Sequence, residues 1–480
     1  MRMHAIFSQY SLKYAEIIVY MLQSTEYQAL PYLRWYWRTN DFSRVIRRRT
    51  LDKTTVAKVL LFTLRFGIFV QVTCGFALIG LNLFGHIEDL WQLGTALVLS
   101  YPVVWAHLIV APLMLGDLLI IKPRNKKLIS RSKQIFSEFQ GVKIAVAGSY
   151  GKTTMKEILN VVLSEGKHVS VTPANKNTAI SHAQFALTLT GRENVLVVEF
   201  GEGRPGDVSK FTRTVVPQIG VITGIAPAHL DHYRTVDEAA RDIFSLADFL
   251  RGENTFVNEE SSLARPYIKN SYTNYSSRGV GRWKISNIKI SVHGTSFNMV
   301  KHNKKLKLRS GLLGRHQVGP LAAAVAIADL LGLDENQIQH GVAKTKAFEH
   351  RMEAKEFHGA WIIDDTYNGN IEGVRAGLEL LAELPAKRRI YVTPGLVDQG
   401  VETKKVHIRM GFLIAKFSPD QLVLMRNSVT DYIHRGLVDN NFKGKLLIVD
   451  DPLEYYTNLE HYLATGDVIM LQNDWTDNYT

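Results

Sequence analysis

Two long apolar stretches dominate the first quarter of the chain. Residues 59–84 carry a single charge, Arg65, and residues 91–121 carry only Asp117. Each stretch exceeds the roughly 20 residues that a helix needs to cross a bilayer, so the pattern predicts two transmembrane helices that form a hairpin. A buried helical hairpin in a soluble domain is the alternative. The stretches start too far from Met1, and are too long, to be a cleavable signal peptide.

Charges around the two stretches predict their orientation. Basic residues cluster at 47–53 and 122–131, whereas residues 85–90 contain acids but no Lys or Arg. Because the cytoplasmic flanks of membrane helices are enriched in Lys and Arg, both ends of the hairpin are expected in the cytoplasm. Residues 1–50 are aromatic and basic, which suits a membrane interface, with a solvated basic helix as the alternative.

A strand, a glycine-rich turn and a helix follow in immediate succession. Residues 143–147 are apolar and β-branched, as in a buried parallel strand, and residues 153–165 place apolar side chains at helical spacing. The turn and the start of the helix consist of Gly148, Ser149, Tyr150, Gly151, Lys152, Thr153 and Thr154. Backbone N–H groups and a helix N-terminus converge there, which predicts a phosphate-binding loop with Lys152 on the β- and γ-phosphates and Thr153 on Mg²⁺. Val146 stands where a standard P-loop has an earlier glycine, and a glycine turn with a solvated lysine is the alternative.

Further strands predict an open α/β sheet around this loop. Residues 195–200 form a second buried strand that contains Glu199 near its end, and residues 219–223 form a third. A carboxylate at the carboxyl end of a strand beside a phosphate loop can complete a Mg²⁺ site. Residues 284–308 alternate in short runs separated by polar turns, as in an antiparallel meander. The lysines at 301–307 are interpreted as a solvated face.

Strand and helix patterns alternate again in the last third of the chain. Strands are predicted at residues 361–365, 389–393, 421–425, 445–449 and 467–471. Alternation of this kind predicts a second, Rossmann-like doubly wound sheet. The sequence therefore predicts an α/β protein with a transmembrane hairpin region at 1–135, a P-loop ATP-binding domain at 136–313 and a Rossmann-like domain at 314–480.

Composition narrows the set of partners. The 480 residues are 46% hydrophobic and 21% charged, which suits about three folded domains rather than a disordered chain. One cysteine, Cys74, excludes an internal disulfide and a Cys-x-x-Cys metal or redox motif. The net charge of +12 favours an anionic partner such as a phosphorylated substrate or a membrane surface. No nucleic-acid-binding motif is present, so nucleic acid is not expected as a partner.

Four segments, taken in their order and spacing, resemble one enzyme family. GSYGKTT, TPANKNT, VVEFGEGRPGD and ITGIAPAHLDHYRTVDEAARD are similar to the central ATPase domain of the Mur ligases, nearest to the group that adds D-alanyl-D-alanine to UDP-N-acetylmuramoyl-tripeptide. The resemblance covers residues 141–480 and excludes the membrane hairpin. It implies that Glu199 and His229 are Mg²⁺ ligands together with Thr153. It also implies that His229 acts in catalysis with Lys152.

The same resemblance assigns residues in the last domain. Arg351, in the segment HRME, would approach the γ-phosphate and act in catalysis, with an exposed, salt-bridged arginine as the alternative. Asp365, in DDTYNGN, would contact ribose. Gln317 and Pro320, in GRHQVGP, occupy the two asparagine positions of a segment that helps hold adenine, and proline cannot donate a side-chain hydrogen bond. The substrate-binding candidates are Asn175, Asn177, Asn368 and Asn370.

One position departs from the family pattern. Counted from His229, the carbamylated lysine that bridges or orients Mg²⁺ in these ligases falls on Ile243, which cannot bind a cation. Asp242 or Asp248 would have to supply a carboxylate instead, or a different arrangement of ions operates.

The resemblance implies an ATP-dependent ligase at the cytoplasmic face of a membrane. It would use ATP and Mg²⁺ to activate a carboxylate as an acyl phosphate, which an amino acid or dipeptide then attacks. No pattern for gripping the UDP end of a substrate precedes Gly141, so the acceptor is expected to be lipid-linked, or UDP-linked and bound by the N-terminal basic region. Two alternatives stay open. One is a ligase that extends an amino-acid polymer such as polyglutamate, and the other is a non-catalytic ATP-binding scaffold of a cell-wall complex.

Overall fold

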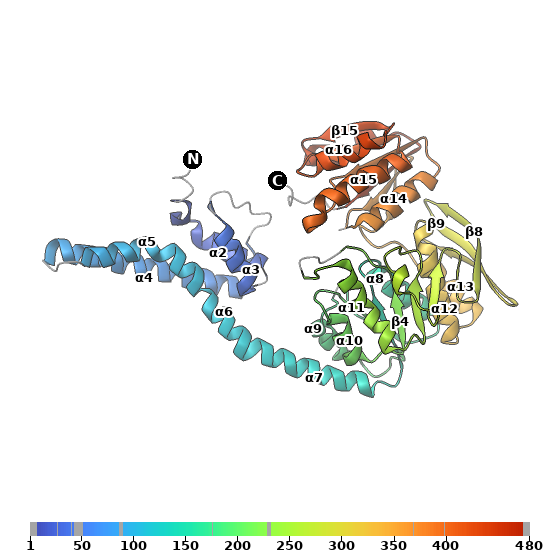
Figure 1. The fold of residues 1–480 in the computed structure, drawn as a ribbon, viewed down its shortest axis with the longest axis horizontal. Helices are drawn as coiled ribbons and strands as arrows, with labels where there is room; N and C mark the ends of the chain where they lie inside the picture. The colour runs from blue at the N-terminus through green and yellow to red at the C-terminus, as the bar shows by residue number, and fades with distance from the viewer. Residues whose placement is uncertain are drawn as a thin grey trace. The chain divides into compact units, whose positions relative to one another are not determined.

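The chain divides after Lys127 into two compact units (Figure 1). The computed structural model describes residues 7–25, 27–39, 41–42, 51–85, 90–174, 176–227, 232–367, 369–397 and 399–473.

The first unit is entirely helical. Its elements are η1 (Ser8–Tyr10), α2 (Tyr14–Ser24), α3 (Ala29–Arg38), α4 (Thr55–Gly85), α5 (Leu90–Leu108), α6 (Val110–Gly116), the π-helical turn η3 (Asp117–Ile121) and the first residues of α7 (Lys122–Glu138). Helix α4 contains the first predicted span, whereas the second predicted span is divided among α5, α6 and η3, with Pro102 inside α5.

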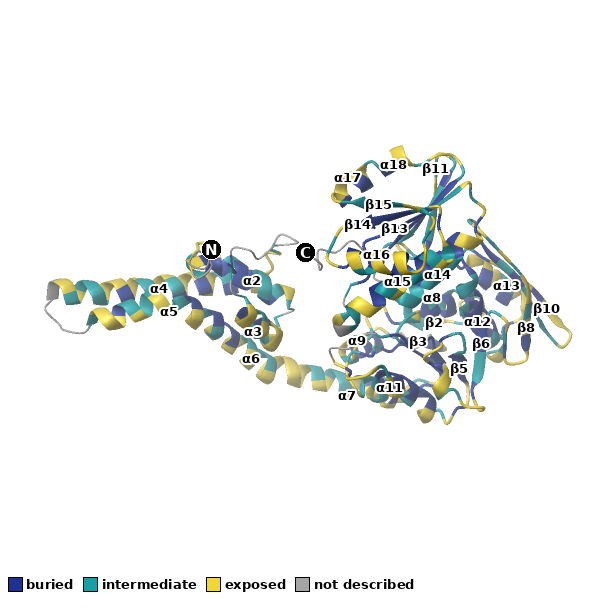
Figure 2. Ribbon diagram, turned by 45° about the horizontal axis from the view of Figure 1, so that its top comes forward, coloured by how far each residue is buried: buried dark blue, intermediate teal, exposed yellow. Residues whose placement is uncertain are grey.

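Two stretches of this unit are long and apolar enough to cross a membrane. They cover Thr55–Leu83 and Leu90–Glu138, and only 11% and 17% of their most apolar windows are buried (Figure 2). The two stretches resemble membrane-spanning helices in length and composition. A core helix of a soluble domain can be equally long and apolar, but such a helix buries most of its apolar surface.

Helices α4 and α5 approach closely where a glycine of one faces a glycine of the other. A Cβ atom built on Gly94 would lie 2.6 Å from the carbonyl oxygen of Gly75, so no side chain fits between the two backbones. One turn away, the Gln71 amide donates to the carbonyl of Leu97 at 2.9 Å and contacts the Ser100 hydroxyl at 3.3 Å. Small residues and interhelical hydrogen bonds are the features that hold helices together in lipid.

The close contact between Gly94 and Gly75 should be sensitive to an added methyl group. Gly94→Ala is expected to destabilise the hairpin by roughly 1–3 kcal/mol, because the added methyl group forces the helices apart. Thermal unfolding of the detergent-solubilised protein measures this effect. Gly80→Ala in α4 is the matched control, since beyond the helix's own backbone no atom of the described residues lies within 4 Å of the added Cβ. Equal melting temperatures for both variants would show that α4 and α5 can move apart at Gly94 without loss of stability, which would contradict the prediction.

The two short helices pack on the hairpin through tyrosine side chains. Buried Tyr14 donates from its hydroxyl to the carbonyl of Pro102 at 2.6 Å, and buried Tyr32 donates to the carbonyl of Ala106 at 3.1 Å. Ala106 lies in the last turn of α5, where helix carbonyls lack their usual partners. The tyrosines therefore tie α2 and α3 to the end of α5.

The second unit contains a mixed sheet of ten strands followed by a mixed sheet of six (Figure 1). The strands of the larger sheet are β1 (Val142–Ala147), β2 (Val169–Val171), β3 (Val195–Glu199), β4 (Ile219–Ile222), β5 (Thr255–Asn258), β6 (Thr273–Ser276), β7 (Gly279–Val280), β8 (Trp283–Ser291), β9 (Gly294–Lys301) and β10 (Lys304–Ser310), in the order β10-β9-β8-β7-β6-β5-β4-β1-β3-β2. Strands β1 to β6 are parallel, and β7 to β10 form the expected antiparallel meander.

Helices cover both faces of the larger sheet. They are α8 (Lys152–Leu163), α9 (Ala179–Ala186), α10 (Asp207–Val215), α11 (Val236–Phe249), α12 (Val318–Leu330) and α13 (Glu335–Lys344). Along β1, Ile144 and Val146 face α8, α12 and α13, while Ala145 and Ala147 face α9, α10 and α11. Both faces are buried, which explains why the strand is apolar at every one of these positions.

The smaller sheet follows the predicted doubly wound pattern. Its strands are β11 (Glu353–Phe357), β12 (Ala360–Asp365), β13 (Arg388–Thr393), β14 (Gln421–Met425), β15 (Lys445–Val449) and β16 (Asp467–Gln472), and its helices are α14 (Ile371–Glu383), α15 (Thr403–Phe417), α16 (Thr430–Asp439), α17 (Pro452–Thr457) and α18 (Leu459–Tyr462). The order is β11-β12-β16-β13-β14-β15, in which only the edge strand β11 is antiparallel. Tyr391 of β13 faces the core under α14 to α16, and its neighbours Ile390 and Val392 face α17 and α18.

Candidate nucleotide-binding site

The loop between β1 and α8 is a tight glycine turn held against the end of β4. Gly148 has φ 144° and Gly151 has φ 74°, conformations that L side chains rarely adopt. A Cβ on Gly148 would lie 2.3 Å from the Thr223 hydroxyl. That hydroxyl donates to the carbonyl of Tyr150, and the Ser149 N–H donates to the carbonyl of Gly224 at 2.7 Å. The turn is therefore braced from the neighbouring strand.

The turn aims the N-terminus of α8 into the site. Gly151 is the N-cap residue, and no side chain from the described part of the chain caps the helix. An uncapped helix N-terminus presents backbone N–H groups and a positive dipole end, which attract a phosphate.

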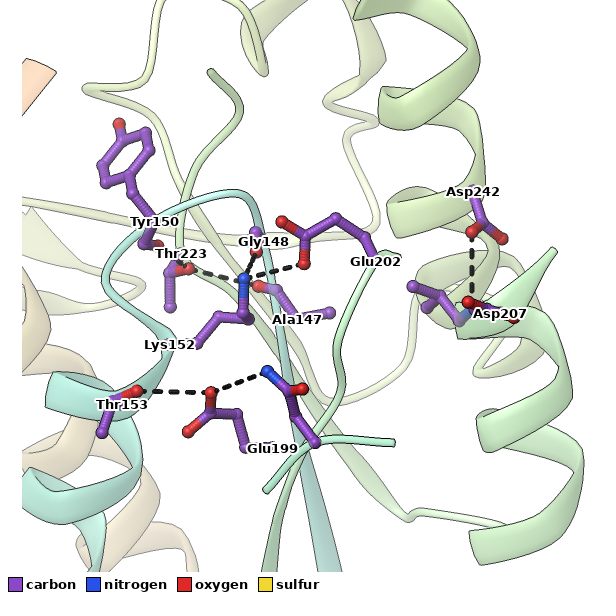
Figure 3. Close-up of polar contacts among 12 residues, drawn as sticks. Ala147, Gly148, Tyr150, Lys152, Thr153, Glu199, Glu202, Asp207, Thr223 and Asp242 are labelled. Carbon is purple, nitrogen blue, oxygen red and sulfur yellow. Dashed lines mark hydrogen bonds and ion pairs between the residues drawn. The ribbon is translucent and has the colours of Figure 1, made fainter. Parts of the chain in front are cut away.

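Lys152 is held in place by a buried acid. Its ammonium group donates to the carbonyl of Gly148 and forms an ion pair with Glu202 at 2.7 Å (Figure 3). The side chains of Lys152 and Glu202 are only 12% and 2% exposed. Glu202 is a site residue that the sequence pattern alone did not reveal. Its position three residues after Glu199, in the Gly-Glu-Gly turn, is the signal that could have found it.

Thr153 and Glu199 lie together, as the sequence predicts. The Thr153 hydroxyl donates to Glu199 Oε1 at 3.3 Å (Figure 3). The amide of Asn177 donates to the same oxygen at 3.2 Å. The ammonium group of Lys156, one helical turn beyond Lys152, lies 3.6 Å from the other oxygen of Glu199. A hydroxyl, a carboxylate and a lysine thus meet at the carboxyl ends of β1 and β3.

The two acids suit a magnesium ion. Glu199 Oε2 and Glu202 Oε1 are buried oxygens without a hydrogen-bond partner among the described residues. Mg²⁺ prefers such oxygen ligands and is usually bound by one or two carboxylates plus phosphate oxygens. Within the described ranges no group of three or more His, Cys, Asp or Glu side chains forms a metal site, so a site here would need phosphate or water oxygens as well. The predicted ligand His229 lies outside the described residues, as do the candidates Asn175 and Asn368.

The position expected for a modified lysine lies in the core. Ile243 is fully buried in α11 and packs among the side chains between the sheet and α10. Its neighbour Asp242 accepts a hydrogen bond from the Tyr233 hydroxyl at 2.8 Å and lies beside the start of α10, away from Lys152 (Figure 3). Asp248 is exposed and pairs with Lys269. Each of the two alternative carboxylates is therefore engaged elsewhere.

The predicted adenine-binding residues lie at the start of α12, directly after the ten-stranded sheet. Gln317, at the start of α12, donates its amide to the ring of His316 at 3.0 Å, while Pro320 lies in the first turn of the same helix. Burial and the nearby charge of Arg375 lower the pKa of His316 to about 4, so this ring is a neutral acceptor at pH 7. Burial raises the pKa of the Tyr150 hydroxyl in the loop, and the charge of Arg375, in α14, opposes that rise.

Arg351 and Asp365 form a second group at the end of β12. The guanidinium group of Arg351 lies 4.1 Å from the centre of the Tyr367 ring. Asp365 accepts hydrogen bonds from the Gln472 amide at 2.7 Å and from the Met352 N–H at 3.2 Å. The side-chain oxygen of Asn370 caps α14 by accepting from two backbone N–H groups, which leaves only its NH₂ group for a ligand.

Asp365 makes folding stability depend on pH. Burial raises the pKa of its carboxyl from 3.8 to about 7, against the opposing effects of Gln472, Met352 and Arg351. The folded state therefore keeps the proton when the unfolded chain has lost it. Stability falls as pH rises from about 4 to about 7 and then levels off.

Asp365→Asn is expected to flatten this slope. The asparagine cannot ionise, so the variant should gain about 1–3 kcal/mol relative to the wild type at pH 8 and little at pH 4. Urea unfolding at the two pH values measures the difference. If the free energy of unfolding changes with pH in the same way for the two proteins, the pKa of the Asp365 carboxyl is not raised in the folded state, and the prediction is wrong.

Comparison with a protein-family model places this site in a known domain type. Residues 146–328 match the Mur ligase middle domain. Among curated proteins, the UDP-N-acetylmuramoyl-tripeptide–D-alanyl-D-alanine ligase of Escherichia coli strain K12 is 26% identical over 278 residues, which cover 56% of this chain and 61% of that ligase. The ligase of the same name from Synechocystis is 29% identical over 301 residues, which cover 61% of this chain and 64% of the relative. The chain thus spans a little over three fifths of the length of these two relatives.

Solved structures share the fold. MurF from Acinetobacter baumannii matches with a TM-score of 0.64 and 21% identity, over 73% of this chain and 77% of that one. MurF from Thermotoga maritima, solved in complex with ADP, matches with a TM-score of 0.63 and 22% identity, over 73% of this chain and 80% of that one.

Proposed function

We propose that the protein is an ATP-dependent ligase of the Mur type, which joins a carboxylate to an amine through an amide bond. The match of residues 146–328 to the Mur ligase middle domain supports this proposal. One observation carries the proposal. The glycine loop presents Lys152 and Thr153 on one turn of α8, and the Thr153 hydroxyl touches the acid that ends β3. That is the arrangement needed to hold a γ-phosphoryl group and its metal ion.

The reaction has two steps. An oxygen of the acceptor carboxylate attacks the γ-phosphorus of ATP, the bond to the β-phosphate oxygen breaks, and ADP leaves. The amine then attacks the acyl carbon, phosphate leaves and the nitrogen loses a proton. Lys152 and the N-terminus of α8 stabilise the charge that develops on the phosphoryl oxygens. For Lys152 to do so, its ammonium group must turn from Glu202 toward the phosphates.

Thr153, Glu199 and Glu202 would hold Mg²⁺, with His229 as a further ligand. The metal ion would neutralise phosphate charge in the site. Arg351, Gln317 and Asp365 would contact the nucleotide when the C-terminal domain closes, which also keeps water from the acyl phosphate.

The acceptor proposed is a muropeptide-like carboxylate, and the amine an amino acid or a dipeptide such as D-alanyl-D-alanine. The names of the two curated relatives support this choice. Asn177, in the loop before α9, and Asn370, the N-cap of α14, would contact these substrates together with Asn175 and Asn368. The reaction would belong to peptidoglycan precursor synthesis.

A phosphate-release assay tests the ligase proposal. The detergent-solubilised protein is given ATP, Mg²⁺, UDP-N-acetylmuramoyl-tripeptide and D-alanyl-D-alanine, and the peptide product is followed by mass spectrometry. Release that requires both acceptor and amine supports the ligase. Product formation with glutamate in place of the dipeptide would favour a polymer-extending ligase. ATP binding without any turnover would favour a scaffold.

We propose further that α4 and the α5–η3 segment cross the cytoplasmic membrane with both ends inside. The support is the length and low burial of these helices and the basic flanks of the hairpin. A reporter fused after Thr480 that is active only inside the cell supports this orientation. Activity only outside the cytoplasm contradicts it.

A further inference from the structure

One segment of the second unit carries basic residues and no acids. Residues 261–328 contain 12 Lys and Arg residues and no Asp or Glu. The formal net charge of the whole chain is also +12, so the other residues contain equal numbers of basic and acidic side chains, with an excess of basic ones at the N-terminus. The segment includes β6 to β10, and β10 is the edge of the ten-stranded sheet (Figure 2).

Strand register gathers much of this charge on one face. Three cross-strand rows run over β8, β9 and β10, and they are Lys284–Val300–Lys305, Ser286–Asn298–Lys307 and Lys289–Ser296–Arg309. The five cations of these rows are all exposed, and we call the surface they form the basic face. The opposite side of the same strands carries buried residues such as Phe297, Met299 and Leu308, which pack in the core.

The basic face lacks compensating acids. Strands β8 to β10 contain no Asp or Glu, and none of the ion pairs seen among the described residues involves the five cations. Lys301 and Lys304 differ, because they point to the other side and both pair with Asp329. Like charges at neighbouring sheet positions repel one another, so an uncompensated array of this kind costs stability unless an anion covers it.

The chemistry of the face favours a lipid surface over nucleic acid. The positions between the cations are Ser286, Ser296, Asn298 and Val300, and no aromatic side chain is present for bases to stack on. The same chain carries two helices apolar enough to cross a membrane. A membrane-anchored chain meets phospholipid headgroups at high effective concentration.

We propose that the basic face binds anionic phospholipid headgroups. Each cation close to an anionic bilayer contributes roughly a fivefold gain in membrane affinity, and the contribution fades beyond a Debye length of about 8 Å. The proposal rests on the membrane location proposed above but not on the ligase chemistry.

Energy transfer in nanodiscs tests the proposal. In the full chain, Cys74→Ser removes the one native cysteine, and Asn298→Cys places a donor dye at the centre of the basic face. The protein is reconstituted into nanodiscs of phosphatidylcholine, with or without phosphatidylglycerol, that carry an acceptor dye on a fraction of the headgroups. Transfer is expected to be at least about twofold higher with phosphatidylglycerol and to return to the neutral level in 1 M salt, where the Debye length is about 3 Å.

Charge removal supplies the controls. The triple variant Lys284→Gln, Lys305→Gln and Lys307→Gln should lose the gain. Lys404→Gln, Lys405→Gln and Lys416→Gln, which remove equal charge from exposed positions on α15, should keep it. Transfer that ignores phosphatidylglycerol, or that survives the first triple variant, overturns the proposal.

Two further outcomes separate this proposal from the others. Lys152→Ala should keep the lipid-dependent transfer, since catalysis is not involved. A chain that fails to enter nanodiscs at all contradicts the membrane location and this proposal together, while leaving the ligase proposal standing. An RNA oligonucleotide that binds the wild type but not the first triple variant, with no lipid effect, would assign the face to nucleic acid and overturn the proposal.

Discussion

Lys152→Ala is expected to lower ATP-dependent phosphate release by roughly 10²–10³-fold, because it removes a preorganised positive charge from the phosphoryl site. Phosphate release under saturating ATP and substrates measures the loss. Lys405→Ala on α15 is the control, since that side chain is 83% exposed and forms an ion pair with nearby Glu402. A loss below about threefold would place the phosphoryl group away from this lysine and contradict the proposed site.

Loss of activity in Lys152→Ala must be separated from loss of folding. The substitution leaves Glu202 as a buried carboxylate without its ion pair, which costs stability in its own right. The double variant Lys152→Ala, Glu202→Gln removes both charges. We expect it to recover most of the melting temperature but none of the activity, and recovery of activity would mean that the lysine serves only to neutralise Glu202.

Lys156→Met is expected to cause the largest loss of stability, about 3–5 kcal/mol. The Lys156 side chain is fully buried and donates to the carbonyls of Thr172 at 2.8 Å and Ala174 at 2.7 Å. Its charge also lies 3.6 Å from Glu199. Methionine fills the space but leaves two carbonyls without a donor and a carboxylate without a counter-ion.

Thermal unfolding measures the effect of Lys156→Met, with an expected fall in melting temperature on the order of 10 °C. Lys210→Met is the matched control. That lysine is 71% exposed, and its ion pair with Asp207 should contribute no more than about 1 kcal/mol. Similar melting temperatures for the two variants would show that other donors replace the Lys156 ammonium group.

Local sequence pattern was sufficient for the elements that build the site. The strand, glycine turn and helix from Val142 to Leu163 are contiguous in the chain. The turn needs glycine because its backbone adopts a left-handed conformation, and a turn between an adjacent strand and helix can be recognised from the local sequence. Glu199 could be placed next to Thr153 because parallel strands bring their carboxyl ends to one edge of a sheet. The apolar length of α4 required no tertiary information either.

Contacts between distant segments were decided only by the tertiary structure. Helical spacing predicted the buried side chains of α8 from its apolar residues, but it could not show that Lys156 is buried, because a lysine is normally solvated. The carbonyls that receive its ammonium group come from a loop beyond β2. Glu202 gained its role in the same way, since its partner lies 50 residues earlier in the chain.

The lysines of the meander show the same division. The sequence by itself determined that residues 261–328 are rich in Lys and Arg and free of acids. Only strand register decided that Lys284, Lys307 and Arg309 share one face while Lys301 turns away to Asp329. The physical reason is that composition follows from the chain alone, whereas a face is formed by the pairing of strands, which depends on the packing of the whole sheet.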